Sequence, residues 1–163
     1  MPAGDRVYAA DQPRVVARGR RTTSTAAITT TETGVLRIDN IPIFDVKAYG
    51  ILTSNINLDT SVANDIADMR IRIATAATPG TAATTASTQI AHFRNTIDDL
   101  AFSNVLPLSA FYFPSADGYL SVLLTCQRVA GTGNIVVFCS AVELLDMVVQ
   151  ELGADPGDTG VVI

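Results

Sequence analysis

Few side chains in this sequence are of the types that commonly carry out catalysis, and His92 is the only histidine. A Ser-His-Asp or Cys-His arrangement needs a histidine beside the nucleophile, and a histidine-based zinc site needs several such ligands. The sequence also lacks H-E-x-x-H, G-x-S-x-G and Walker motifs. We therefore expect His92 to be a structural imidazole, either in the core or on the surface.

Carboxylates are the other groups that could do chemistry, and they fall into two clusters: Asp59, Asp65 and Asp68 in one, and Asp98 and Asp99 in the other. Such clusters can supply oxygen ligands to Ca²⁺, but the spacing does not match an EF-hand loop. Two carboxylates can also hydrolyse a glycosidic bond, although the sequence has no Trp to serve as a sugar platform. We expect solvated loop acids, with no metal and no other cofactor.

The remaining motifs with chemical potential have simple structural interpretations. Cys126 and Cys139 lie in the apolar segments LLTCQRV and VVFCSAV. Free Cys is among the most buried residue types, so we expect two reduced thiols in the core. A disulfide is the open alternative, because cross-strand neighbours can meet its geometry. Gly131 and Gly133 indicate a turn rather than a phosphate cradle, because no helix begins after them.

The composition favours a folded domain with a weakly charged surface. Of the 163 residues, 48% are hydrophobic and 17% are charged, whereas about a quarter is the usual charged share. A protein held in an assembly tolerates such a surface, and so does a well-packed β-protein. The net charge of −5 disfavours nucleic-acid binding. We expect no membrane span and, without an apolar signal-peptide core, synthesis in a cytoplasm without export by a signal peptide.

The strands that position the candidate residues can be predicted from hydrophobic alternation, beginning with the first part of the segment 66–93. Met69, Ile71 and Ile73 fall on one side of it, and Arg70 and Arg72 fall on the other. This period of two is typical of a half-buried β-strand. A run of Ala, Thr, Pro and Gly follows, and then a second extended segment at 87–94. We predict a long β-hairpin with a low-complexity tip.

Similar patterns predict extended structure at 14–18, 35–43, 47–58, 105–113, 119–129 and 135–142, with Pro42 ending the second segment. Residues 59–68 resemble a loop, and residues 130–134 a hairpin turn. Residues 140–153 are ambiguous, because a capping box and a terminal Gly favour a helix whereas Leu145, Met147 and Val149 alternate. About eight short strands predict an all-β fold, an antiparallel β-sandwich of jelly-roll type.

The chain is expected to comprise an extended N-terminal arm at 1–33, a β-sandwich domain at 34–152 and a C-terminal tail at 153–163. The arm carries a net charge of +2 and the remainder −7. A basic arm on an acidic body can bind an acidic neighbour, including another copy of the chain; a solvated tail is the alternative. The candidate contact residues lie in the arm, the hairpin tip and the tail: Arg14, Arg18, Arg20, Arg21, Thr78, Pro79, Thr81, Val161, Val162 and Ile163.

Five segments carry a family resemblance: RVVAR at 14–18, TTTETGVLRIDNIPI at 29–43, TSNINLDTSVANDIADMRIRIAT at 53–75, ATTASTQI at 83–90 and VVQELGADPGDTG at 148–160. In their order they resemble small β-sandwich structural proteins from the virions of tailed phages that infect actinobacteria. The resemblance spans most of the chain and rests on structural motifs. It implies a homotrimeric virion component and favours a strand, rather than a helix, at 140–153.

We therefore expect a non-enzymatic virion protein. The first hypothesis is a capsid decoration (cement) protein that binds the major capsid protein or other virion subunits as a homotrimer. The alternative is a minor tail or fibre-tip module that recognises the host surface. A small hydrolase that acts through carboxylates such as Asp98 and Asp99 is the third class.

Overall fold

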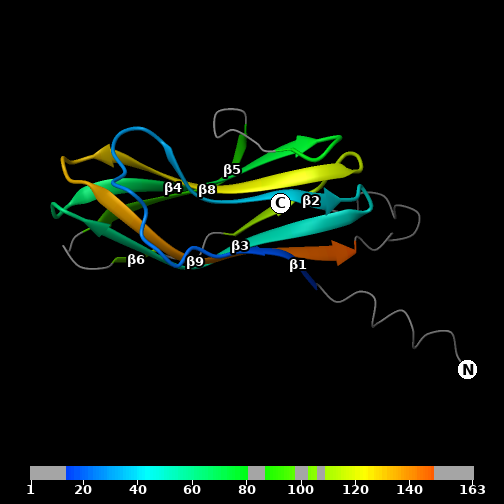
Figure 1. The fold of residues 1–163 in the computed structure, drawn as a ribbon, viewed down its shortest axis with the longest axis horizontal. Helices are drawn as coiled ribbons and strands as arrows, with labels where there is room; N and C mark the ends of the chain where they lie inside the picture. Colours follow the sequence, from blue (N-terminus) through cyan, green and yellow to red (C-terminus); the bar gives the residue numbers. More distant parts are fainter. Residues whose placement is uncertain (1–13, 81–86, 98–102, 106–108, 149–163) are drawn as a thin grey trace, which may run out of the picture.

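The computed structural model describes residues 14–80, 87–97, 103–105 and 109–148, and this part of the chain is all-β, without a helix (Figure 1). The strands are β1 (Arg14–Gly19), β2 (Thr33–Ile43), β3 (Lys47–Thr60), β4 (Asp65–Ala76), β5 (Thr88–Ile97), β6 (Ser103–Val105), β7 (Ser109–Tyr112), β8 (Gly118–Ala130) and β9 (Ile135–Val148). Every strand pair among them is antiparallel. The prediction of an antiparallel all-β protein is confirmed.

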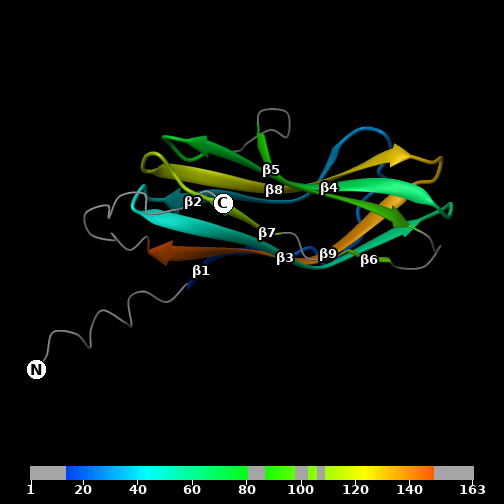
Figure 2. The same ribbon diagram turned by 180° about the vertical axis from the view of Figure 1, so that it is seen from behind.

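The strands form two sheets, which lie as two layers when the molecule is seen from either side (Figures 1 and 2). Sheet A has the order β1-β9-β3-β6, with β7 also paired to β3. Sheet B has the order β2-β8-β4-β5. The chain changes sheet at each step from β1 to β4, and β4 and β5 then form the predicted hairpin.

The strand pairs are nested along the sequence. β1 pairs with β9, β2 with β8, β3 with β6 and β7, and β4 with β5. The first half of the chain therefore pairs with the second half in reverse order, as in one long two-stranded ribbon. Two further pairs, β3 with β9 and β4 with β8, join turns of this ribbon and complete the sheets.

One hydrophobic cluster contains side chains from both sheets. In β4, Met69, Ile71 and Ile73 are buried in this cluster, whereas Arg70 and Arg72 lie on the other face. The predicted alternation is thus confirmed. Burying one large aliphatic side chain contributes roughly 1.5–3 kcal/mol, so this cluster holds the two layers together. Its largest fully buried members are Ile28, Tyr49, Ile51, Ile56, Leu58, Met69, Ile71, Ile97, Leu120, Leu124 and Ile135.

Residues 140–148, for which the sequence left helix and strand open, are extended. β9 runs to Val148 and pairs with β1 on one edge and with β3 on the other. Backbone hydrogen bonds to two neighbours replace those that a helix would make, so the pairing overrides the local capping signals. Residues 149–152 lie outside the described part.

The prediction of a hairpin at residues 130–134 is wrong. The turn exists, but it takes the chain from β8 in sheet B to β9 in sheet A. β8 already pairs with β2 and β4, and β9 with β1 and β3, so neither strand has a free edge for the other.

Two predicted boundaries also change. β2 continues through Pro42 to Ile43, because β2 is an edge strand, where a residue without an N–H is tolerated. A bulge with Asn40 at φ of 60° shifts the register just before it. The predicted loop at 59–68 shortens to residues 61–64, because β3 includes Asp59 and β4 begins at Asp65.

Part of the predicted arm belongs to the folded body. The predicted strand at 14–18 is confirmed as β1, at the edge of sheet A. Ile28 is fully buried and forms a bridge with Ile135. Residues 1–13 lie outside the described part.

Candidate functional site

The structure places the predicted contact residues in two regions. Arg14 and Arg18 belong to β1, with Arg20 and Arg21 immediately after it. Thr78 and Pro79 follow β4 and are exposed. Thr81, Val161, Val162 and Ile163 lie outside the described residues, as do Asp98 and Asp99.

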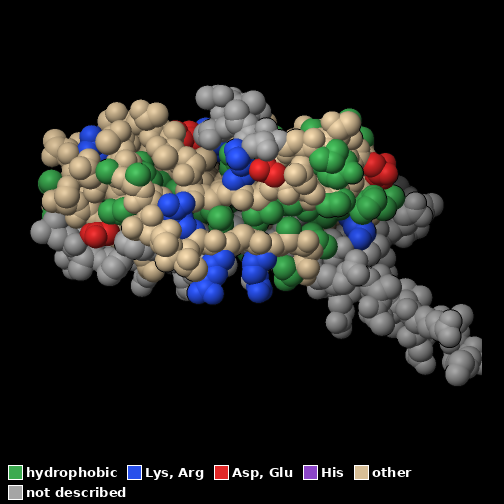
Figure 3. Space-filling model, in the orientation of Figure 1, with side chains coloured by type: hydrophobic (Ala, Val, Ile, Leu, Met, Phe, Trp, Pro, Cys, Tyr) green, Lys and Arg blue, Asp and Glu red, His purple; other side chains and the backbone are tan. Residues whose placement is uncertain are grey.

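The arginines near β1 differ in their surroundings. Arg18 and Arg20 are exposed, and Lys and Arg side chains project from the side of the molecule along which β1 runs (Figure 3). Arg21 is half-buried, and its guanidinium donates to the carbonyls of Thr23 (2.8 Å) and Val35 (2.9 Å), and also to that of Ser24 (3.0 Å). Arg21 therefore fixes the path of the chain between β1 and β2.

The strand registers bring several segments to one end of the molecule, which we call the β2–β3 end. On sheet A, Tyr49 pairs with Tyr112 and with Asp146, and Asp146 also pairs with Arg14 at the start of β1. On sheet B, the end of β4 pairs with Tyr119 beside the β7–β8 connection. The β2–β3 turn joins the two sheets here, so Thr78 and Pro79 and the start of β1 are at the same end.

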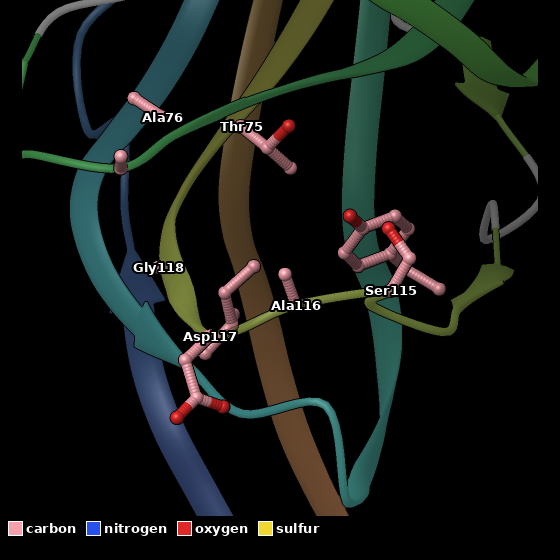
Figure 4. A pocket seen from close by; sticks show the side chains of 9 residues that line it. Thr75, Ala76, Ser115, Ala116, Asp117 and Gly118 are labelled. Carbon is pink, nitrogen blue, oxygen red and sulfur yellow. The ribbon is translucent and has the colours of Figure 1, made fainter.

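A cavity of about 240 Å³ opens at this end (Figure 4). The backbone N–H of Asp45 donates to the Asp117 carboxylate (3.0 Å), which ties the β2–β3 turn to the β7–β8 connection. Burial raises the pKa of Tyr112, against the effect of its hydrogen bond with Thr75, so its phenol stays neutral. The cavity can offer hydroxyl and carboxylate groups to a polar ligand. Its lining residues are Ile43, Thr75, Ala76, Ala77, Tyr112, Ser115, Ala116, Asp117 and Gly118.

Exposed apolar side chains gather on the outer face of sheet A and on the adjacent β2–β3 turn. Phe111 is 65% exposed and Phe113 67% exposed, whereas Ala110, which precedes Phe111 in β7, is buried in the core. Sequence reasoning missed this surface, although the alternation in VLPLSAFYF was a signal for it. We call the following set the apolar surface: Val15, Phe44, Val46, Leu52, Phe111 and Phe113.

The Asp68 carboxylate lies in an ion-pair network on the outer face of sheet B. It is 2% exposed and accepts hydrogen bonds from Arg94 (Nε, 2.7 Å) and Arg70 (Nη2, 2.8 Å), with His92 Nε2 at 3.1 Å. The hydrogen bond from Arg94 lowers the pKa of Asp68, with His92 and Arg70 acting in the same direction and burial opposing them. The prediction of a solvated loop acid is wrong for Asp68, because strand pairing places these basic side chains around it.

Glu32 extends the same network. Its carboxylate accepts two hydrogen bonds from Arg72 (2.6 and 2.8 Å) and one from the Thr125 hydroxyl (2.5 Å). The hydrogen bond from Arg72 lowers the pKa of Glu32, although burial opposes it. The network thus spans β4, β5 and β8, together with the segment that enters β2.

Asp65 is fully buried at the start of β4. It accepts hydrogen bonds from the Thr60 hydroxyl and from the backbone N–H of Gly133 (3.2 Å). Burial alone would raise the pKa of Asp65, but the hydrogen bonds from Thr60, Gly133 and Thr132 outweigh it and lower the pKa. Asp65 is therefore also not the solvated acid that the sequence predicted; it secures the β8–β9 turn.

Within the described ranges, no three His, Cys, Asp or Glu side chains gather into a group that could hold a metal ion. The described residues also include no helix with the length and apolar character needed to cross a membrane. No family model matches this chain, and no curated protein matches it either.

Proposed function

We propose that this chain is a structural protein of a tailed-phage virion, a capsid decoration protein that binds the shell as a homotrimer. The proposal includes a jelly-roll-like β-sandwich as the arrangement of its two sheets. The nested strand order is the observation that carries it. A double sheet wound from one long ribbon is the jelly-roll pattern, which viral capsid domains use.

Fold alone does not establish function, because jelly rolls also serve as lectins and enzymes. The resemblance of five segments to phage virion proteins supports the structural role. The contacts of Asp65 and Asp68 support it as well, since both carboxylates are buried in internal hydrogen bonds rather than directed at a substrate.

Binding to the shell would use the residues that flank the sheets. β1 is an edge strand of sheet A and directly follows residues 1–13. An edge strand can pair with a segment of another protein through its main chain. Three copies on one shell site would multiply a modest affinity for each arm into stable attachment.

Capsid binding tests this proposal. Purified protein is mixed with expanded capsids lacking it, and occupancy is measured by sedimentation with the shell. We expect saturable binding by the full chain and a large loss when residues 1–13 are removed, a deletion that leaves β1 intact. Full occupancy by the shortened chain would refute the role of the arm, and no binding by the full chain would refute the decoration role.

The cavity at the β2–β3 end favours a second candidate, a minor tail or fibre-tip module that recognises the host surface. Its lining combines hydroxyl and carboxylate groups with the aromatic ring of Tyr112, a combination that suits a polar ligand. A labelled antibody against the protein distinguishes the candidates. Label over the shell supports the decoration role, and label at the tail tip supports recognition of the host.

A further inference from the structure

We infer that the apolar surface is where copies of this chain contact one another, so the occupant of this face is a second copy of the chain. The inference rests on the self-association in the proposed function, but it does not depend on whether the protein is part of a virion. It names contact residues that the predicted set of arginines, hairpin-tip residues and tail residues did not include.

The register relates the members of this surface that lie on β1, β3 and β7 of sheet A. Val15 on β1 pairs with Leu145 on β9, Leu145 with Gly50 on β3, and Gly50 with Phe111 on β7. Leu52 lies two residues along β3 from Gly50 and is 39% exposed. Exposed apolar side chains thus lie on β1 and β7, at the two edges of the sheet, and on β3 within it.

The β2–β3 turn extends the surface beyond the sheet. Phe44 is 45% exposed and Val46 66% exposed, and the hydrogen bond between Asp45 and Asp117 holds this turn beside the segment that follows β7. Hydrophobic side chains are visible at this end of the molecule in the space-filling view (Figure 3). The apolar side chains of the β2–β3 turn therefore lie at the same end of the molecule as those of β7 and the segment that follows it.

The exposed area fits a contact between copies. An aromatic side chain offers roughly 200 Å², so the exposed fractions of the three Phe residues amount to about 350 Å². The aliphatic members add roughly half as much again. A standard interface buries about 800 Å² on each partner, somewhat more than half of it apolar. The surface therefore supplies about the apolar area that one side of a stable interface needs.

The charges around the surface indicate a copy of the same chain rather than a strongly acidic or basic partner. Asp45 and Asp117 are exposed at its margin, and the Lys47 ammonium lies over the Phe44 ring at 5.6 Å. Arg18 is exposed on β1 near the other edge. A surface that combines apolar residues with both signs of charge can contact a second copy of the same chain without net repulsion, and closed rings of copies form when such contacts repeat around one axis.

Sedimentation velocity of the full chain, without capsids, tests the inference across micromolar concentrations. The test variant is Phe111→Ser/Phe113→Ser. The matched control is Val62→Ser/Val129→Ser, which changes two hydrophobic residues that are 43% and 37% exposed at the opposite end of the molecule. Circular dichroism establishes that each variant is folded, and both changes in the test variant are at exposed positions.

We expect the wild type and the control to form the same oligomer, and the test variant to associate about tenfold or more weakly. As a second measurement, amides of β7 in the wild type should gain protection from hydrogen exchange as concentration rises. An oligomeric test variant, or β7 protection that ignores concentration, would overturn the assigned surface while leaving self-association intact. A monomeric wild type would overturn both the assigned surface and the self-association. In that case residues 149–163 would be removed and the binding of a hydrophobic dye measured. An increase in dye binding would identify this segment as the occupant of the apolar surface. Capsid binding is measured in a separate experiment, so a failure of the proposed decoration role can be distinguished from a failure of this inference.

Discussion

The Asp65 carboxylate accepts a hydrogen bond from the backbone N–H of Gly133, 68 positions later in the sequence. The contact joins the start of β4 in sheet B to the turn that leads into β9 in sheet A. Two glycines make it possible, because a Cβ at Gly131 or at Gly133 would overlap the Asp65 side chain.

Replacing Gly133 with Ala should destabilise the protein by about 2 kcal/mol or more, because the new Cβ would lie 2.7 Å from Thr60 Oγ1 and 2.8 Å from Val62 N. Urea unfolding followed by circular dichroism measures this change. Gly34→Ala is the matched control, since nothing lies within 4 Å of a Cβ there, and it should leave stability unchanged or slightly increased. Equal effects of the two substitutions would contradict the close approach.

The lowered pKa values of Asp65, Asp68 and Glu32 predict acid sensitivity. A carboxyl whose pKa is lower folded than unfolded stabilises the fold above its unfolded value and loses that contribution as pH falls through its folded value. The free energy of unfolding should therefore be level at neutral pH and fall below about pH 4. Urea midpoints measured against pH test this, and Asp68→Asn should show a shallower fall. If the free energy of unfolding of that variant falls with decreasing pH as steeply as that of the wild type, Asp68 does not contribute to the acid sensitivity.

The Glu32–Arg72 pair should show a coupling free energy of about 1–2 kcal/mol, because it is bidentate and both side chains are only 19% exposed. A double-mutant cycle of Glu32→Gln and Arg72→Met measures it by urea unfolding. Arg37–Asp39 is the comparison pair, with Arg37 45% exposed, and its coupling should be about 0.5 kcal/mol or less. Equal coupling in the two pairs would contradict the ranking.

Cys126 should resist alkylation in the folded protein. Its thiol is free and fully buried, and burial raises its pKa to about 12, so almost no thiolate forms at neutral pH. Peptide mapping after iodoacetamide treatment should find Cys126 unmodified in native protein and modified in urea. Rapid native labelling, or a disulfide at this position, would contradict the structure.

Strand periodicity predicted much of the fold, because the sides of a strand differ whenever one side is buried. Met69, Ile71 and Ile73 could be assigned to the core from this alternation, and the reduced, buried state of Cys126 followed from its apolar neighbours. The crossing of the β8–β9 turn between sheets could not be predicted. Hairpins and sheet-changing turns share the same local residues, and only the occupied edges of β8 and β9 distinguish them.

The candidate site was less predictable, since it depends on residues brought together from distant segments. Asp68 looks like a loop acid until β5 places Arg94 beside it. Phe111 looks like a core residue until the register shows that its neighbour Ala110 faces the core. Arg21 looks like a free cation until the carbonyls of nearby residues come within hydrogen-bond distance.

The nested pairing has a consequence for biosynthesis. β1 pairs with β9, and β3 pairs with β9 along one edge. Sheet A therefore cannot form until the ribosome has synthesised β9, the last described strand. Such non-local pairing slows folding, and the early strands wait with open edges that can pair wrongly. Translation products that stop before β9 would therefore be prone to aggregate, and quality control acting on them would favour full-length copies.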